Sequence, residues 1–429
     1  MSESTNRIND DVTYKLEIEN LEKHFPVNTG IISRILRGES DNAVRAVDGV
    51  SLGIREGEAF GLAGESGCGK TTLGKSSIRL LEPTGGKIHF EGDEITDISG
   101  DELNQFRREA QIIHQDPYQS LNPRFTVYEW VKEPLDVHSI GTPEERDARV
   151  YETIEQAGLQ PAGAYAPEYP SELSGGERQR VGIARALALE PSFLLADEPA
   201  SMLDVSIRAS ILDLFKRLQT ELGLTAVYIS HDLSLLKHMC DRIGIMYLGE
   251  LVEVGSADEI INNPKHPYTQ ALVSSVPRID PSEDRDRIEL VGEVPDPVDM
   301  PSGCRFHPRC PQIVQPEGYG FDQDDWRAIV NLRRDILAGE DIQTAGDEQT
   351  PAAIREAYEL PAQLDDSNAD DVLEEALADV VDGTGTTARE RLKREFATPC
   401  ESAPIETHQV SPTQVAKCVL YNDAPDAAQ

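Results

Sequence analysis

A glycine-rich loop between an apolar and a polar segment constrains this fold more than any other feature. Residues 64–71 read GESGCGKT, which satisfies the pattern G-x-x-x-x-G-K-[S/T]. The preceding residues 58–63 (EAFGLA) predict a short buried strand, and a helix is expected from about Lys70. Strand, glycine turn and helix in this order form the context in which such a loop binds phosphate. We therefore predict a phosphate-binding loop at the end of a strand.

The residue types in this loop fit a nucleotide better than a chance glycine turn. Glycines let backbone N–H groups turn inward toward phosphate oxygens at a helix N-terminus. Lys70 is expected to reach the β- and γ-phosphates, and the Thr71 hydroxyl to ligate Mg²⁺. Cys68 stands where a helix terminus can lower a thiol pKa. The residues expected to bind ATP here are Gly64, Ser66, Gly67, Cys68, Gly69, Lys70, Thr71 and Thr72.

Two adjacent carboxylates end a second apolar segment, residues 193–198 (FLLADE). A buried strand that ends in adjacent acids is unfavourable unless a cation or proton chemistry compensates the charge. We expect Asp197 to hold Mg²⁺ through water and Glu198 to polarise an attacking water. These residues therefore point to nucleotide hydrolysis.

Residues 173–180 (LSGGERQR) open a helical run and form a second candidate anion site. One chain then carries two half-sites for phosphate that are unconnected in sequence. A simple way to use both is head-to-tail dimerisation. In such a dimer, Ser174 and Gly176 of one subunit close over the γ-phosphate that Lys70 of the other subunit binds.

The pattern along the chain indicates at least two domains. Strand-like runs alternate with helical segments over residues 14–262, which predicts an α/β fold with a parallel sheet. No strong strand pattern occurs over residues 116–188, so a helical subdomain is expected there. Residues 1–13 are polar and are expected to form a flexible N-terminus. Prolines and asparagines from residue 263 mark the boundary of a second domain, 263–429.

The charge balance limits the partners. The 77 acidic residues exceed the 40 basic ones and give a formal net charge of −37. Such a field repels phosphate backbones, so nucleic acid is not expected as a partner. The chain has 29 arginines and only 11 lysines, a surface that suits molar salt, where the Debye length is about 3 Å. We therefore expect a salt-loving microbe. No apolar run of about 18 residues exists, so no membrane span is expected, and the N-terminus lacks a signal-peptide pattern.

With these motifs in this order, residues 14–255 resemble the ABC ATPase family. The resemblance implies that Gln115 touches Mg²⁺ and senses a membrane subunit, and that His231 contacts the γ-phosphate. It further implies that Phe25 stacks on adenine and that Asp204 lies in the D-loop, here SMLD (201–204). The residues implied to act on the ATP of the partner subunit are Ser174, Gly175, Gly176 and Glu177. The expected catalytic set is Glu198, His231 and Gln115, with Thr71, Gln115 and Asp197 at Mg²⁺.

A narrower resemblance is to the F-type ATPase of oligopeptide/dipeptide importers. It is carried by residues 64–75 (GESGCGKTTLGK), 114–124 (HQDPYQSLNPR), 196–207 (ADEPASMLDVSI) and 266–277 (HPYTQALVSSVP). It implies a D-type ATPase partner, two permeases and an external binding protein, at the cytoplasmic face of the membrane. Three alternatives stay open: import of nickel or sugar, a soluble ABC protein of DNA repair or translation, and a non-catalytic scaffold. The intact Lys70, Glu198 and His231 oppose the scaffold, and the single motor module opposes the soluble class.

Four cysteines lie in two segments, 302–311 and 398–420, that resemble the ends of the family's small α+β C-terminal domain. They are Cys304, Cys310, Cys400 and Cys418. Four thiolates suit a [4Fe–4S] cluster, which some family members carry, or zinc, and free thiols are the third possibility. Neither pair has the C-x₂₋₄-C spacing usual for zinc, and the further cysteine of the family pattern is missing.

The span between the two cysteine segments is unusually long, and residues of about 315–395 are expected to be an acidic insertion. Within it, residues 364–382 hold eight acids and no base. Such a segment is either a solvated helix or a disordered insertion.

Overall fold

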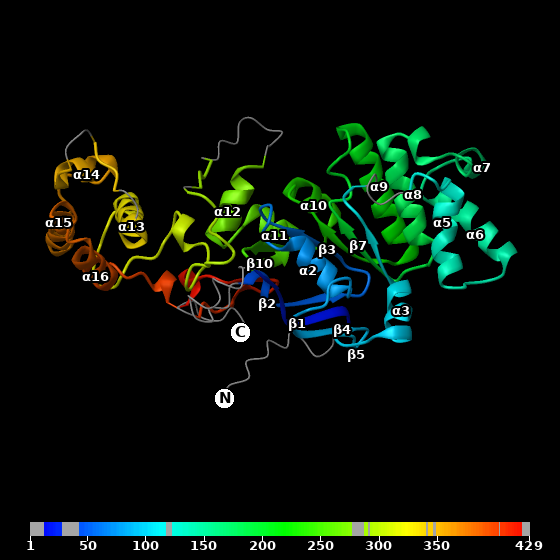
Figure 1. Cartoon of the computed structure of the whole chain (residues 1–429), viewed down its shortest axis with the longest axis horizontal. Helices are drawn as coiled ribbons and strands as arrows, with labels where there is room; N and C mark the ends of the chain where they lie inside the picture. The colour runs from blue at the N-terminus through cyan, green and yellow to red at the C-terminus, as the bar shows by residue number, and fades with distance from the viewer. Residues whose placement is uncertain are drawn as a thin grey trace. The chain divides into compact units, whose positions relative to one another are not determined.

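The computed structural model describes residues 13–27, 43–116, 122–276, 287–290, 292–339, 342–345, 349–402 and 404–422. The chain divides into two compact units, Met1–Asn263 and Pro264–Gln429, and Figure 1 shows their elements. Of the expected flexible N-terminus, only Thr13 lies within the described residues. The first unit contains the predicted phosphate-binding loop, and the second contains the four cysteines Cys304, Cys310, Cys400 and Cys418, all of them free thiols.

A mainly parallel sheet forms the core of the first unit. Its strands are β3 (Ala59–Ala63), β6 (Ala110–Ile113), β7 (Phe193–Asp197), β8 (Thr225–Ile229), β9 (Arg242–Tyr247) and β10 (Glu250–Ser256). They lie in the order β10-β9-β3-β8-β7-β6, and only the β9–β10 pair is antiparallel. Every residue of β3, β7 and β8 is buried, as is usual for parallel strands covered on both faces. The carboxyl ends of β3 and β7 therefore meet the same edge of the sheet.

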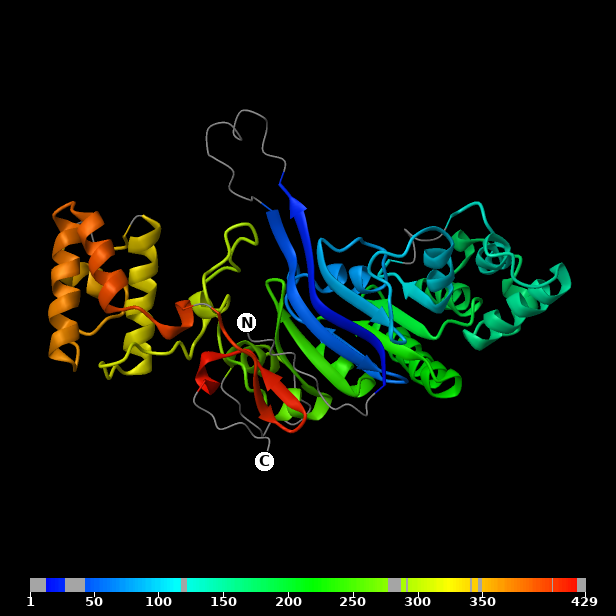
Figure 2. The ribbon, with the colours of Figure 1, turned by 90° about the horizontal axis from the view of Figure 1, so that it is seen from below.

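A second, antiparallel sheet completes the first unit. Its strands are β1 (Tyr14–Pro26), β2 (Ala43–Arg55), β4 (Gly85–Phe90) and β5 (Asp93–Glu94), in the order β2-β1-β4-β5. Figure 2 shows β1 and β2 as a long twisted pair. Leu16, Ile18 and Ile88 are buried, whereas Glu17 and Glu19 lie on the opposite face, because successive side chains of a strand alternate between faces.

The helices of the first unit follow the strands, as the sequence pattern predicts. They are α2 (Lys70–Ser77), α3 (Gly100–Glu109), α5 (Val127–Val137), α6 (Pro143–Gln156), α7 (Ala162–Tyr165), α8 (Gly175–Leu187), α9 (Val205–Leu222), α10 (Leu233–Met239) and α11 (Ala257–Asn262). Helices α5, α6 and α8 pack on one another and form a helical group (Figure 1). Thr126, Thr142 and Ser174 each begin a helix with a capping box.

The second unit contains a helical segment between its two cysteine-bearing parts. Its helices are α12 (Pro267–Ser274), α13 (Gln323–Ala338), α14 (Pro351–Ala357), α15 (Ser367–Val381) and α16 (Gly385–Glu395), and β11 (His408–Ser411) and β12 (Gln414–Ala416) form a hairpin. The acidic residues 364–382 are therefore mainly helical. In α15, Ala369, Leu373, Ala376 and Leu377 are buried at helical spacing. Within the described ranges, no helix is long and apolar enough to cross a bilayer.

Candidate active site

The predicted phosphate-binding loop links β3 to α2 through glycines that the backbone requires. Gly64 and Gly69 have φ of 151° and 108°, values that side chains rarely adopt. A Cβ atom at Gly64 would meet the carbonyl oxygen of Met246, and one at Gly69 would meet that of Ala46. Both positions therefore require glycine. The loop can then follow this tight path from β3 to the start of α2.

Lys70 is buried at the beginning of α2 and folds back over the loop. Its Nζ atom donates hydrogen bonds of 2.8 Å to the carbonyl oxygens of Gly64 and Glu65. Its third contact is a long one of 3.9 Å to Sγ of Cys68, and an ammonium group held by such neutral groups can exchange them for phosphate oxygens. The neighbouring Cys68 differs from expectation, because burial raises the pKa of its thiol and outweighs the opposing effect of Lys70. Cys68 is therefore a buried residue of the loop whose thiol form is favoured.

The structure brings the paired carboxylates to the phosphate-binding loop. The Thr71 hydroxyl donates a hydrogen bond of 2.8 Å to Oδ1 of Asp197, the last residue of β7. Lys75 lies 3.8 Å from the other carboxylate oxygen of Asp197. A hydroxyl and a carboxylate at this distance are suitable ligands for Mg²⁺, directly or through water. Two of the three residues expected to bind Mg²⁺, Thr71 and Asp197, are thus already in contact.

Glu198 lies between the two other residues expected to act in catalysis. Its Oε2 atom accepts a hydrogen bond of 3.0 Å from Nε2 of Gln115, and its Oε1 atom lies 3.4 Å from Nδ1 of His231. Glu198 adopts the left-handed backbone conformation, with φ of 47°, and its N–H donates to the carbonyl of Ile229 at the end of β8. The three predicted catalytic side chains therefore meet beside the phosphate-binding loop.

The residues predicted to act across a dimer lie at the start of α8. Ser174 is the exposed N-cap of this helix, and its hydroxyl donates 2.6 Å to Glu177 Oε2. That hydrogen bond lowers the pKa of the Glu177 carboxyl. Gly176 packs so closely that a Cβ atom there would strike Ile207 of α9. Ser174, Gly175 and Glu177 therefore lie at an accessible helix N-terminus. This geometry is suited to binding an anion.

Two further predicted residues lie on the surface of the first unit. Phe25, near the end of β1, is 37% exposed, and Lys23 Nζ lies 5.0 Å from its ring centroid. Asp204 is the N-cap residue of α9 but accepts no capping hydrogen bond through its side chain. Beside it, Met202 and Val205 expose 64% and 81% of their area, an unusual amount for apolar side chains.

The four free cysteines of the second unit come from two segments that are in contact through Cys304 and Cys400. Cys304 N–H donates 2.8 Å to the carbonyl of Cys400, and a Cβ atom at Gly303 would strike that carbonyl. Burial raises the pKa of Cys304 to about 12, and Cys400 and Cys418 add to the effect. Burial likewise raises the pKa of Cys310, with smaller contributions from the other three thiols. Burial therefore disfavours the thiolate form of these cysteines, so a thiolate here needs a compensating cation.

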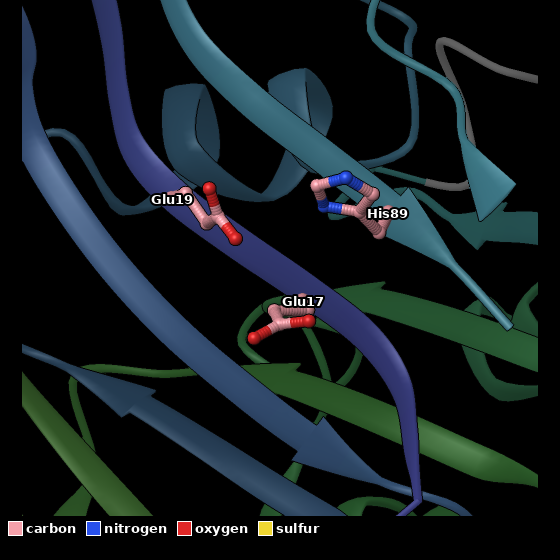
Figure 3. A group of neighbouring side chains, drawn as sticks. All are labelled: Glu17, Glu19 and His89. Atoms are coloured by element: carbon pink, nitrogen blue, oxygen red, sulfur yellow. The ribbon is translucent and has the colours of Figure 1, made fainter. Parts of the chain in front are cut away.

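Another group of candidate metal ligands was not expected from sequence. Glu17 and Glu19 of β1 and His89 of β4 point toward one another (Figure 3), and their ligand atoms lie within 4.8 Å of one another. Among the described residues, it is the one group of three or more His, Cys, Asp or Glu side chains that meets this limit. Alternate acids in β1 were visible in the sequence, but His89 joins them only through the pairing of Glu17 with His89.

The phosphate-binding loop, the paired carboxylates and the helical group define an ATP-binding cassette ATPase. Residues 47–201 match the family described as ABC transporter, and residues 252–316 match the oligopeptide/dipeptide transporter C-terminal region. Residues 323–413 match a domain of unknown function. The structure of cbiO1 from Clostridium perfringens, part of the ABC transporter complex cbiONQ, aligns with a TM-score of 0.50 at 27% identity, over 58% of this chain and 92% of that one.

Two Bacillus subtilis proteins are similar over most of their length. The oligopeptide transport ATP-binding protein AppF is 48% identical over 304 residues, 70% of this chain and 90% of AppF. The putative oligopeptide transport ATP-binding protein YkfD is 49% identical over 302 residues, 70% of this chain and 88% of YkfD. The chain belongs to the family of oligopeptide-type ABC transporter ATP-binding subunits. As such it hydrolyses ATP with Mg²⁺ to drive transport through transmembrane permease subunits, with which it associates peripherally at the membrane.

Proposed function

We propose that this subunit powers the uptake of oligopeptides or dipeptides from the cytoplasmic face of the membrane. The proposal draws its substrate class from AppF and YkfD, which are named for oligopeptide transport. It draws its mechanism from one observation above all, the contact of Glu198 with both Gln115 and His231. Nickel or sugar import is the alternative for the same motor.

The proposed chemistry assigns a role to each side chain at the loop. Backbone N–H groups of residues 64–72 bind the phosphates, and Lys70 neutralises their charge. Thr71, Asp197 and Gln115 would hold Mg²⁺, which would offset the negative charge that develops on the phosphate oxygens. Glu198 orients and polarises the attacking water, and His231 contacts the γ-phosphate. Phe25 is the proposed surface on which adenine stacks, as its partial exposure allows.

The second half of each site is proposed to come from another subunit. The Ser174 hydroxyl has its described hydrogen bonds with Glu177 of the same helix, and in the proposed dimer it exchanges the bond to the Glu177 carboxylate for one to a phosphate oxygen on the facing surface. The exposed Met202 and Val205 flank Asp204 and supply apolar area for a subunit interface. The family resemblance further favours a D-type ATPase as the partner, so that the working motor is a heterodimer.

The cysteine site is proposed to hold a [4Fe–4S] cluster. A tetrahedral zinc site, with Zn–S near 2.3 Å, needs sulfur atoms only about 3.8 Å apart. No three of the four thiols lie within 4.8 Å of one another among the described residues. Wider spacing fits a cluster better, because its cysteines bind different iron atoms. The residues that would hold it are Cys304, Cys310, Cys400 and Cys418.

The experiment that tests the proposed substrate uses the subunit with the permeases and binding protein encoded by its source. The complex is reconstituted in sealed proteoliposomes that contain ATP in the lumen. Labelled oligopeptide, dipeptide, nickel or sugar is then added outside. ATP-dependent accumulation of a peptide supports the proposal. Accumulation of nickel or sugar alone would assign the same motor to another solute.

We also propose that the acidic surface is an adaptation to salt, so that thermal stability rises with molar KCl.

A further inference from the structure

We propose that the inserted helix α13 is a brace that holds the two cysteine-bearing segments together, which gives a role to the domain of unknown function. The helix lies within residues 323–413 and between the two segments in sequence. Two of its arginines, spaced by six residues, each contact a different segment. The brace consists of contacts within the protein and does not require a metal. Its effect on a cluster rests on the proposed cysteine site.

Arg327 binds the first cysteine segment through backbone carbonyls. Its Nη1 atom donates hydrogen bonds of 3.0 Å to the carbonyl of Cys310 and 3.4 Å to that of His307. Its Nη2 atom donates to the carbonyl of Pro308. One planar guanidinium thereby gathers three carbonyl oxygens of the turn that ends at Cys310. The conformation of this turn therefore depends on α13.

Arg333 binds the second cysteine segment through a carboxylate. Its two terminal nitrogens donate hydrogen bonds of 2.5 and 2.8 Å to the two oxygens of Glu401, the residue after Cys400. The Arg333 side chain is only 4% exposed. His307 of the first segment lies 3.6 Å from the same carboxylate, so Glu401 joins both segments. A bidentate pair made by a buried guanidinium fixes both position and orientation.

The rest of the insertion fixes α13 in place. At its beginning, Trp326 stacks on Phe321 and meets Phe396 edge to face, with centroids 5.3 and 6.2 Å apart. Phe396 follows α16, so the two ends of the insertion close on one aromatic cluster. At the end of α13, Nε of Arg389 in α16 donates a hydrogen bond of 2.7 Å to the carbonyl oxygen of Ile336. The insertion is thus a folded support for α13 and not a loose loop between the cysteines.

The direct test measures how fast each cysteine is alkylated in chelator-treated, full-length protein, by mass spectrometry. Arg327→Met should speed alkylation of Cys310, and Arg333→Met that of Cys400, each by roughly tenfold or more, because removing one partner of a buried polar contact frees its segment. Glu401→Gln, which removes the same ion pair from the other side, should match Arg333→Met at Cys400.

Two internal controls make the outcome specific. Arg391→Ala removes ion pairs of α16 with α15, which involve no residue of either cysteine segment, and should change neither rate more than about twofold. Cys240, buried in the first unit, should stay protected in every variant. Unchanged rates at Cys310 and Cys400 would overturn the brace. Faster alkylation of Cys240 as well would also contradict it, because that would mean general unfolding.

A second readout separates the brace from the cysteine centre. In protein purified without oxygen, both arginine variants should lose iron faster than the wild type, measured as iron per chain and as absorption near 400 nm. Wild-type protein without any metal, but with the predicted alkylation pattern, would refute the centre and leave the brace. Wild-type protein with a cluster that both variants retain equally, with unchanged alkylation, would refute the brace and leave the centre.

Discussion

The Thr71 hydroxyl and the Asp197 carboxylate, 126 residues apart in sequence, are joined by a hydrogen bond of 2.8 Å. Thr71 lies in the first turn of α2, which follows β3 and the loop, and Asp197 ends β7. A divalent cation that binds here must replace or share this hydrogen bond, since the same two oxygens are the best hard ligands at the loop. The contact is therefore a preformed half of the proposed Mg²⁺ site.

Removal of the Thr71 hydroxyl should weaken Mg²⁺ more than ATP. In Thr71→Ala, the Mg²⁺ concentration at half-maximal hydrolysis should rise by roughly tenfold or more, as for loss of one ligand or its support. Thr71→Ser, which keeps the hydroxyl, should restore the wild-type value. A Mg²⁺ titration of ATP hydrolysis measures both. Equal Mg²⁺ dependence in Thr71→Ala and wild type would remove Thr71 from the site.

Sequence reasoning identified the loop and the carboxylates because their residue types and spacing carry the chemistry. It did not reveal that Gln115 donates to Glu198, since that contact depends on β6 lying beside β7. The acidic residues 364–382 were ambiguous because charge dominated the segment. Their helical nature follows from four buried apolar side chains of α15, which depend on packing against α16.

The missed features have the same physical origin. The grouping of His89 with Glu17 and Glu19 depends on strand register, which one sequence does not specify. Arg327 and Arg333 look like ordinary residues of a charged helix, and only the tertiary contacts with Cys310 and Glu401 distinguish them.

Ser174→Arg should separate binding from turnover. The variant should keep nucleotide affinity in the isolated subunit, because Ser174 is proposed to act on the ATP of a partner. It should lower turnover of the assembled motor by at least about a hundredfold, since a guanidinium blocks the facing phosphate site. Nucleotide titration by fluorescence and phosphate release measure the two quantities. Equal loss of affinity in the isolated subunit would place Ser174 in its own ATP site.

Cys310→Ser should destabilise the second unit without disabling the loop at Lys70. Anaerobic wild-type protein should absorb near 400 nm and contain about four irons per chain, and the variant should lose both. Limited proteolysis should then cut the insertion faster, because the proposed cluster would stabilise the fold around it. A colourless wild-type preparation with one zinc per chain would exclude the cluster.

The stability of the second unit should fall in acid because of His266. Burial lowers the pKa of this side chain from 6.5 to about 3, so below pH 6.5 the unfolded chain binds a proton that the folded chain does not. The stabilisation is complete above pH 6.5 and is lost toward pH 3, by up to about 1.4 kcal/mol per pH unit. His266→Asn can keep the cap that His266 Nδ1 provides to Tyr268 N–H. Its melting temperature should drop less than that of the wild type between pH 7 and 5, and an equal drop would refute the assignment.

The most direct test of the account is ATP turnover by Glu198→Gln in the assembled transporter. The amide keeps the size of the side chain but cannot polarise water, so turnover and solute uptake should both fall by roughly two orders of magnitude or more. Mg-ATP should still bind and should accumulate in a stable closed dimer, seen by size-exclusion chromatography with retained nucleotide. Hydrolysis by Glu198→Gln at a rate near that of the wild type would contradict the proposed role of Glu198 and the mechanism built on it.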